Sequence, residues 1–261
     1  MEQPAWASTA VSGLLAGPPL DAFVLASTGV AAYLAAPQRG PAAVVLALLS
    51  QRAVRLPLGV CVSAERLPDA GTTVRIGDGL VAAAGYAWRP VRWWDPRPRL
   101  PAAGLLRYGP RLLSAVLDAP AGAFGLPWPE AFRVAGALAA GDPAPAIAVI
   151  GLGPGLTPAA DDVVAGALAV LALTGRLDES VRRAIDSRAA TYTTGLSAAL
   201  LATAGRGEVI PQAARVLSLL AAGAQAGRIQ AAAADLFRVG STSGHDLCAG
   251  MAGALASIGG R

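Results

Sequence analysis

The chain has 261 residues, which is enough for one large domain or for two ordinary ones with a full core. Its composition is 54% hydrophobic with a mean hydropathy of +0.51, but alanine supplies most of that excess. The two longest apolar stretches, residues 22–37 and 163–174, fall short of the roughly 20 strongly apolar residues of a spanning helix, so we expect no membrane segment. The net charge is +4, and the chain has arginines but no lysine. The one cluster of arginines is interrupted by prolines, so we expect no nucleic-acid partner.

The first hundred residues predict a small β-containing unit, because short apolar runs alternate there with turn signals. Gly77-Asp78-Gly79 suits a tight hairpin. Residues 20–36 and 42–52 are candidate helices, although their alanine-rich composition leaves the type of element open. Strands are predicted at residues 58–65, 72–76 and 80–84.

The cysteines and the first residues bear on location. Cys61 and Cys248 lie far apart, with neither the spacing of a zinc site nor a disulfide framework, so we expect free thiols. The chain begins Met1-Glu2-Gln3-Pro4, without the charged and apolar regions of a secretory signal. We therefore expect a cytoplasmic protein.

A segment rich in tryptophan, arginine and proline, residues 88–99, follows the predicted strands. Its prolines exclude a helix interior and predict an extended surface segment. From residue 102 onward the apolar spacing is helical. We therefore expect an α+β protein, with a small β-containing N-terminal part (residues 1–100) and a mainly α-helical C-terminal part (residues 101–261). The elements predicted in the second part are helices at residues 102–117, 163–173, 179–204, 209–222, 229–237 and 247–257 and a strand at residues 146–150.

A glycine-rich turn follows this predicted strand and leads into a helix. Gly151, Gly153 and Gly155 let a ligand or another backbone approach without a β carbon in the way. Thr157 is a suitable N-cap and Pro158 a suitable first helical residue, so amide groups at this helix start would favour an anion. We therefore expect Gly153, Gly155 and Thr157 to bind substrate.

The turn matches neither of the two common nucleotide motifs. A dinucleotide fingerprint needs its third glycine inside the helix start and an acidic residue about 20 positions later. Here the third glycine comes too early, and Gly175 leads into another predicted helix. A P-loop needs a lysine, and the sequence contains none.

Two carboxylates in the first helical turn, Asp161 and Asp162, leave two interpretations open. They either complement the helix dipole, worth roughly 0.3–1 kcal/mol each, or hold a cation such as Mg²⁺ between themselves and an anionic ligand. Asp161 and Asp162 are therefore the candidate metal ligands. Mg²⁺ is the one cofactor that the sequence indicates.

A second glycine-rich helix start, near residue 243, has the same organisation as the first. Ser243 and Asp246 fit a capping box with Asp in place of Glu. Asp246 and Gly250 repeat the spacing of Asp162 and Gly166, which leaves a bare patch beside a carboxylate on one helix face. Two such helix starts can converge on one small ligand.

His245 is the single histidine, so its side chain is the one that changes charge most readily near neutral pH. It is a candidate general acid or base, and the alternative is a hydrogen-bonding residue in a capping loop. The predicted catalytic residues are Asp162, Asp246 and His245, and the second helix start contributes Thr242, Ser243 and Gly244 to substrate binding.

Three blocks of the second part carry a family resemblance. They are Gly151-Leu152-Gly153-Pro154-Gly155-Leu156-Thr157-Pro158 with Asp161-Asp162 and Gly166, then Thr193-Thr194-Gly195-Leu196-Ser197 with Ala204-Gly205-Arg206-Gly207, and finally Thr242-Ser243-Gly244 with Asp246 and Gly250. This arrangement resembles the AllH family over residues 145–255. The chain has Ala159-Ala160 where that family usually has Ser-Gly.

The resemblance implies a subunit of an oxamate carbamoyltransferase that acts with an FdrA-like subunit and a further partner in allantoin (purine) breakdown. That enzyme exchanges a carbamoyl group between oxalurate and phosphate, giving oxamate and carbamoyl phosphate. All four compounds are small anions, which suits two helix starts. Backbone donors there would also stabilise charge that develops on the carbonyl oxygen during transfer.

Two other interpretations stay open. In the first, the chain is a non-catalytic scaffold or interaction subunit of a carbamoyl- or acyl-transfer complex, its glycines allow close helix packing, and its acids are caps. In the second, it handles a nucleotide or CoA. That interpretation rests on the family's usual partner alone.

Overall fold

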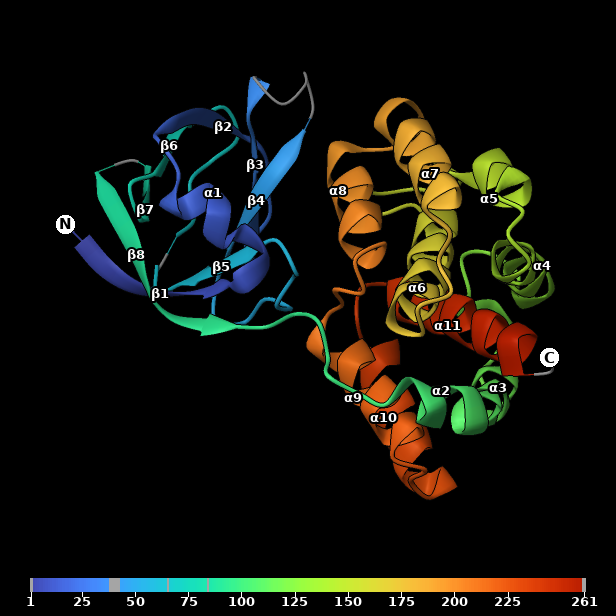
Figure 1. The fold of residues 1–261 in the computed structure, drawn as a ribbon. Helices are drawn as coiled ribbons and strands as arrows, with labels where there is room; N and C mark the ends of the chain where they lie inside the picture. The colour runs from blue at the N-terminus through green and yellow to red at the C-terminus, as the bar shows by residue number, and fades with distance from the viewer. Residues whose placement is uncertain (1, 38–42, 65, 84, 260–261) are drawn as a thin grey trace. The chain divides into compact units, whose positions relative to one another are not determined.

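The structure, a computed structural model, describes residues 2–37, 43–64, 66–83 and 85–259. The chain divides into two compact units, Met1–Pro96 and Arg97–Arg261. Figure 1 shows a unit built of strands and a unit built of helices. Each is described by itself.

The first unit is a barrel that its described strands close completely, in the order β1-β5-β4-β3-β2-β6-β7-β8. Strands β1 and β8 pair in parallel, as do β4 and β5, and the other neighbours are antiparallel. A short helix, α1 (Ser12–Ala16), follows β1. The strands are β1 (Glu2–Ser8), β2 (Leu20–Ser27), β3 (Ala31–Ala35), β4 (Val44–Leu49), β5 (Gly59–Val62), β6 (Thr73–Gly77), β7 (Leu80–Ala83) and β8 (Tyr86–Trp94).

The barrel corrects the predicted α+β class, in which the N-terminal part was only a small β-containing unit. Residues 20–36 were a candidate helix, but they form β2 and β3. The hydroxyl of Thr28 accepts hydrogen bonds from the amides of Val30 and Ala31, and this turn reverses the chain. Ala42, in the second candidate helix, lies outside the described residues, and β4 follows it.

The three predicted strands are confirmed as β5, β6 and β7. β5 and β7 are shorter than predicted, and β6 is shifted by one residue; Glu65 and Ala84 lie outside the described residues. Asp78 and Gly79 have positive φ angles of 52° and 79°, as a tight hairpin between β6 and β7 requires. The predicted extended segment begins as β8. Its Pro90 stands where the register with β1 shifts, a position that tolerates a residue without an amide proton.

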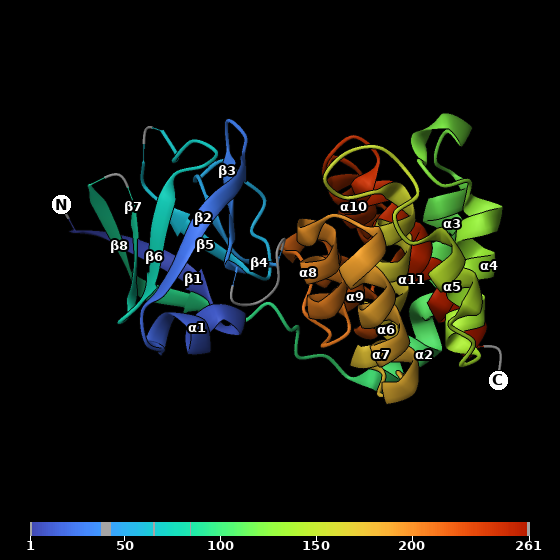
Figure 2. The same cartoon turned by 90° about the horizontal axis from the view of Figure 1, so that it is seen from above.

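The second unit is helical, and two central helices carry its core (Figure 2). α6 and α11 are apolar on most sides, as expected for helices that neighbours surround. The helices are α2 (Ala102–Tyr108), α3 (Leu112–Leu117), α4 (Trp128–Ala139), α5 (Ala144–Val149), α6 (Ala159–Leu173), α7 (Glu179–Tyr192), α8 (Gly195–Ala204), α9 (Pro211–Ala221), α10 (Ala226–Phe237) and α11 (Ser243–Gly259).

Helices α6 and α11 cross in backbone contact. A methyl group added to Gly250 would lie 1.9 Å from the carbonyl oxygen of Val163, and one added to Gly166 would lie 2.1 Å from that of Leu247. The bare patches that the sequence predicts beside two carboxylates are therefore filled, each by the backbone of the other helix.

The strand predicted at residues 146–150 is wrong, because α5 occupies this place. The carboxylate of Asp142 accepts a hydrogen bond from the amide of Ala144 at 2.9 Å and so supports a helix start there. The helix predicted over residues 179–204 is two helices, α7 and α8, with Thr193 and Thr194 between them.

Within the described ranges, none of the helices combines the length and the apolar character needed to cross a membrane.

The helix crossing predicts a large effect of one methyl group. Gly250→Ala should destabilise the helical unit by about 1–3 kcal/mol or more, because the added carbon meets a backbone oxygen that cannot move aside. Urea unfolding followed by helical circular dichroism measures the change. The matched control is Gly227→Ala in α10, which meets nothing within 4 Å and should be neutral or slightly stabilising. Equal stabilities of the two variants would contradict the crossing.

Candidate functional site

The loop between α5 and α6 is exposed from Leu152 to Leu156 and contains three glycines with positive φ angles. Gly151 packs against α7, because a β carbon there would lie 2.1 Å from the carbonyl oxygen of Tyr192. Gly153 folds onto the helix start, where its β carbon would lie 2.7 Å from the amide nitrogen of Ala159. Gly155 faces open space. Among these glycines it is therefore the best placed for a ligand.

Thr157 was predicted to cap α6, but the helix begins at Ala159 and its N-cap is Pro158, which makes no side-chain bond. The Thr157 hydroxyl instead lies 3.2 Å from the hydroxyl of Ser243 at the start of α11. The two glycine-rich helix starts thus meet, as the sequence led us to expect.

Asp161 is buried and its carboxylate is taken up by internal bonds. Oδ1 accepts a hydrogen bond from the amide of Gly151 at 2.7 Å. Oδ2 accepts bonds from the hydroxyls of Thr193 and of Ser197, the latter at 2.6 Å. Three donors therefore surround the negative charge, and this aspartate ties the loop to the start of α8.

The start of α8 belongs to the same cluster, although the sequence assigned it no role in the site. Thr194 caps α8 by accepting a bond from the amide of Ser197 at 3.0 Å. Its hydroxyl also donates to the carbonyl oxygen of Leu156 at 2.5 Å. A threonine just before a helical run is an N-cap signal in the sequence, but that signal does not indicate contact with a distant loop.

Asp162 differs from Asp161 because its Oδ2 atom is enclosed and has no hydrogen-bond partner among the described residues. Burial raises the pKa of Asp162 to about 8, hydrogen bonding from Ser243 and Thr157 lowers it in part, and the charges of Asp246 and Asp161 raise it further. At neutral pH the side chain is mostly a protonated acid. The start of α6 therefore carries the hydrogen-bonded carboxylate of Asp161 and the neutral carboxyl group of Asp162.

Asp246 is buried in the first turn of α11, and its carboxylate holds a distant loop. Oδ1 accepts bonds from the amides of Gly125 and Leu126 at 3.0 and 3.1 Å. The carboxylate is therefore engaged by a loop far away in the chain, and the side chain of Thr242 also hydrogen-bonds to it. Burial raises the pKa of Asp246, and these hydrogen bonds oppose the shift. The loop lies close, because a β carbon on Gly125 would lie 2.8 Å from the hydroxyl oxygen of Thr242.

His245 lies between two aromatic rings. Its imidazole stacks on Phe237 with the ring centroids 4.2 Å apart and meets the edge of Phe124 at 5.5 Å. Burial lowers the pKa of His245, and the charge of Asp246 opposes this. Its Nδ1 atom is enclosed without a partner in the described part of the chain. A neutral imidazole is therefore the form present at neutral pH.

The remaining predicted site residues are Thr242, Ser243 and Gly244, and only the first two have polar side chains in the cluster. Gly244 serves packing, because a β carbon there would lie 1.9 Å from the carbonyl oxygen of Leu236. The side chain of Thr242 hydrogen-bonds to Asp246, and the hydroxyl of Ser243 lies near that of Thr157. Across the described ranges, no three His, Cys, Asp or Glu side chains gather as a metal-binding group.

Residues 149–255 match the model of one protein family, described as oxamate carbamoyltransferase subunit AllH. The match confirms the resemblance carried by the three sequence blocks, and it includes the loop, α6 and the start of α11. Comparisons with curated proteins and with solved structures found no match.

The raised pKa of Asp162 predicts a pH-dependent stability. Between about pH 3.9, where an unfolded aspartate titrates, and the folded value of about 8, the unfolded state has already lost the proton that the folded state keeps. The free energy of unfolding should therefore fall as the pH rises through this window, by at most about 1.4 kcal/mol per unit, and level off above it. Urea unfolding of the wild type and of Asp162→Asn, compared across the window, measures this. Parallel curves would contradict the assignment.

The aromatic surroundings of His245 predict its titration. The proton NMR spectrum contains the ring signals of one histidine, so the titration needs no assignment. We expect a pKa below the ordinary value near 6.5, because burial disfavours the charged ring. Phe237→Leu removes the stacked ring and should bring the pKa back toward that value. A wild-type pKa above 6.5 would be the contrary result.

Proposed function

We propose that the helical unit binds a small anionic substrate where α6 and α11 begin, as an AllH-like subunit of an oxamate carbamoyltransferase-type complex in purine (allantoin) catabolism. The complex would exchange a carbamoyl group between oxalurate and phosphate, giving oxamate and carbamoyl phosphate. The family match over residues 149–255 supports the reaction class. The cluster of Thr157, Asp162 and Ser243 supports the place.

The single observation that carries the proposal is the meeting of the two helix starts, where the hydroxyls of Thr157 and Ser243 lie 3.2 Å apart. Two carboxylates at one helix start would repel a phosphate or an oxamate. Asp162 keeps its proton up to a pKa of about 8, which removes one of these two charges, and the charge of Asp161 is directed at its own hydrogen-bond donors. A protonated carboxyl group donates one hydrogen bond, and the hydroxyls of Thr157 and Ser243, which bond to Asp162 and lie 3.2 Å apart, would turn toward an anion when it binds. Together they form a set of donors beside the positive end of a helix dipole.

The proposed roles follow from these contacts. Asp162, Thr157 and Ser243 would contact the anion, and Gly155 leaves room in the exposed loop for it. Asp246 is a positioning residue in this proposal, because its oxygens hold the loop at Gly125. His245, neutral and next to Asp246 in the chain, is the proposed proton acceptor.

Partner subunits are part of the proposal, since the matching family is described as a subunit. An FdrA-like subunit and one further subunit would complete the complex. Mg²⁺ would bind beside Asp162 only after this carboxyl group loses its proton, because the oxygens of Asp161 are engaged by three donors.

A scaffold function is the second candidate, and the packing of the glycines favours it. Gly166, Gly250 and Gly244 meet backbone oxygens of neighbouring helices, so their small size has a structural explanation that requires no ligand. This chain would then hold the complex together while a partner subunit performs the transfer.

Thermal unfolding of the full chain separates the two candidates. Phosphate, carbamoyl phosphate, oxamate and oxalurate are each added with and without Mg²⁺. A ligand at a hundred times its dissociation constant stabilises by about 2.7 kcal/mol, which raises the melting temperature measurably. We expect at least one anion to do so, and the double variant Thr157→Val, Ser243→Ala to lose the shift because it lacks both hydroxyls.

The matched control is Ser241→Ala, an exposed serine just before α11, which should keep the shift. A shift of equal size in the double variant would place the anion elsewhere. If no anion stabilises the wild type, the scaffold candidate is favoured.

A further inference from the structure

The barrel unit lies outside the residues that match the family, and one part of its outer surface has no role in the proposed function. Strand β1 alternates between inside and outside there: Ala5 and Ala7 are buried, and Trp6 between them is 39% exposed. Trp6 is the register partner of Arg92 on β8 and of Cys61 on β5. These three side chains therefore stand in a row on the outside of the barrel.

Two arginines lie over the ring of Trp6. The guanidinium carbons of Arg55 and Arg92 are each 5.0 Å from the ring centroid, and that of Arg55 is 5.9 Å from the ring centroid of Trp94. Arg92 comes from β8, on one side of β1, and Arg55 comes from the segment that leads into β5, on the other side. Contact with the rings attracts these cations and restrains their long side chains. We call Trp6, Arg55, Arg92 and Trp94 the arginine–tryptophan cluster.

The positive charges of this cluster are not neutralised within the described part of the chain. Neither Arg55 nor Arg92 forms an ion pair with a described carboxylate. By contrast, Arg89, on the same strand as Arg92, pairs with Glu2 at 2.6 Å. A guanidinium group without an acidic partner can bind a carboxylate through two parallel hydrogen bonds. The cluster is therefore complementary in charge to an acidic ligand.

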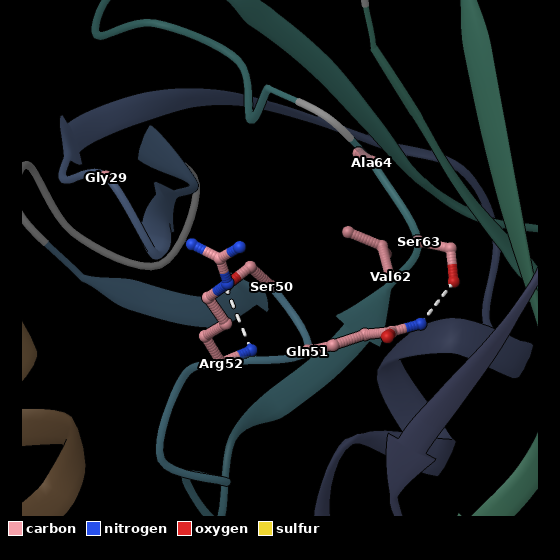
Figure 3. Close-up of a pocket in the computed structure, with 7 residues that line it drawn as sticks. All are labelled: Gly29, Ser50, Gln51, Arg52, Val62, Ser63 and Ala64. Atoms are coloured by element: carbon pink, nitrogen blue, oxygen red, sulfur yellow. Dashed lines mark hydrogen bonds between the residues drawn. The ribbon is translucent and has the colours of Figure 1, made fainter.

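A cavity of about 400 Å³ lies beside the cluster, with Trp6 and Arg55 among its lining residues. The neighbouring pocket in Figure 3, of about 470 Å³, shares Gln51 and Ser63 with this cavity and provides a contrast. None of its described lining residues is aromatic, and its arginine is Arg52, which is not part of the cluster. A side chain that enters the cavity beside the cluster would meet both an aromatic wall and a positive charge.

Residue types and strand pairing favour a protein as the ligand. Tryptophan and arginine are enriched among the residues that dominate binding at protein interfaces. The described strands close the barrel, so a partner would meet side chains there rather than a free strand edge. Single-stranded nucleic acid instead needs open aromatic faces on which bases stack. The ring of Trp6 already has a guanidinium group over it from each side of β1.

We propose that the arginine–tryptophan cluster is a docking site for an acidic segment of a partner protein. Carboxylates of this segment would accept hydrogen bonds from Arg55 and Arg92. An apolar side chain next to them would enter the cavity beside Trp6 and cover Cys61, which also lines it. The partner is thus recognised by acidic and apolar side chains that alternate along an extended segment.

Fluorescence anisotropy of the full chain with a short labelled peptide that alternates glutamate and leucine tests the docking. The matched peptide has glutamine in place of glutamate and should bind about tenfold more weakly or less. The double variant Arg55→Gln, Arg92→Gln should weaken binding of the acidic peptide by about tenfold. The control is Arg75→Gln, Arg228→Gln, which removes as much charge from exposed positions on β6 and α10 and should keep the affinity.

Alkylation of the wild-type chain with iodoacetamide locates the peptide and does not depend on the folding of a variant. Cys248 is buried and Cys61 is half-buried, so the reaction reports on Cys61. Burial raises the pKa of the Cys61 thiol, and the reaction is therefore run at alkaline pH. The acidic peptide should slow the alkylation of Cys61, and the glutamine peptide at the same concentration should not.

Three results would each overturn the proposal: equal affinities of the two peptides, an unchanged affinity in the double variant, or an unchanged alkylation rate of Cys61. A short oligothymidylate is the competing probe. If it bound more tightly than the acidic peptide, the cluster would be assigned to a nucleic acid instead.

Discussion

The backbone contact between α6 and α11 is the constraint on which the helical unit depends. Gly166 and Gly250 each leave room for a carbonyl oxygen of the other helix, so the axes approach more closely than side chains would allow. Asp162 and Asp246 each stand four residues before one of these glycines. Close crossing therefore brings the two carboxyl groups and the hydroxyls around them into one cluster. The packing and the candidate site have the same cause.

Within this cluster, neighbouring aspartates have different tasks because their surroundings differ. Asp161 points to the donors at Gly151, Thr193 and Ser197 and holds the loop in place. Asp162 points into an enclosed space with few donors, and its pKa rises until the group is neutral near pH 7. A carboxylate held by three donors and a carboxyl group without such donors thus stand next to each other in the chain.

The barrel is held differently, by strand pairing and by side chains that alternate between inside and outside. Strand β8 follows this alternation at Trp88 and departs from it after Pro90. Trp88 points inward and is buried, while Val91 and Trp93 are exposed beyond the shift in register at Pro90. The indole nitrogen of Trp88 is enclosed and has no hydrogen-bond partner among the described residues, so the inward position of this ring has a cost.

Local features could be predicted from the residues alone: the glycine-rich helix starts, the hairpin at Gly77–Gly79 and the family resemblance at residues 151–166 and beyond. These depend on residues close together in the chain. Tertiary structure decided the rest. Residues 20–36 are apolar enough for a helix, and pairing with other strands makes them β2 and β3, because barrel closure satisfies their backbone groups. Likewise, the bonds from Asp246 to Gly125 span 121 positions, and nothing local to either residue indicates the other.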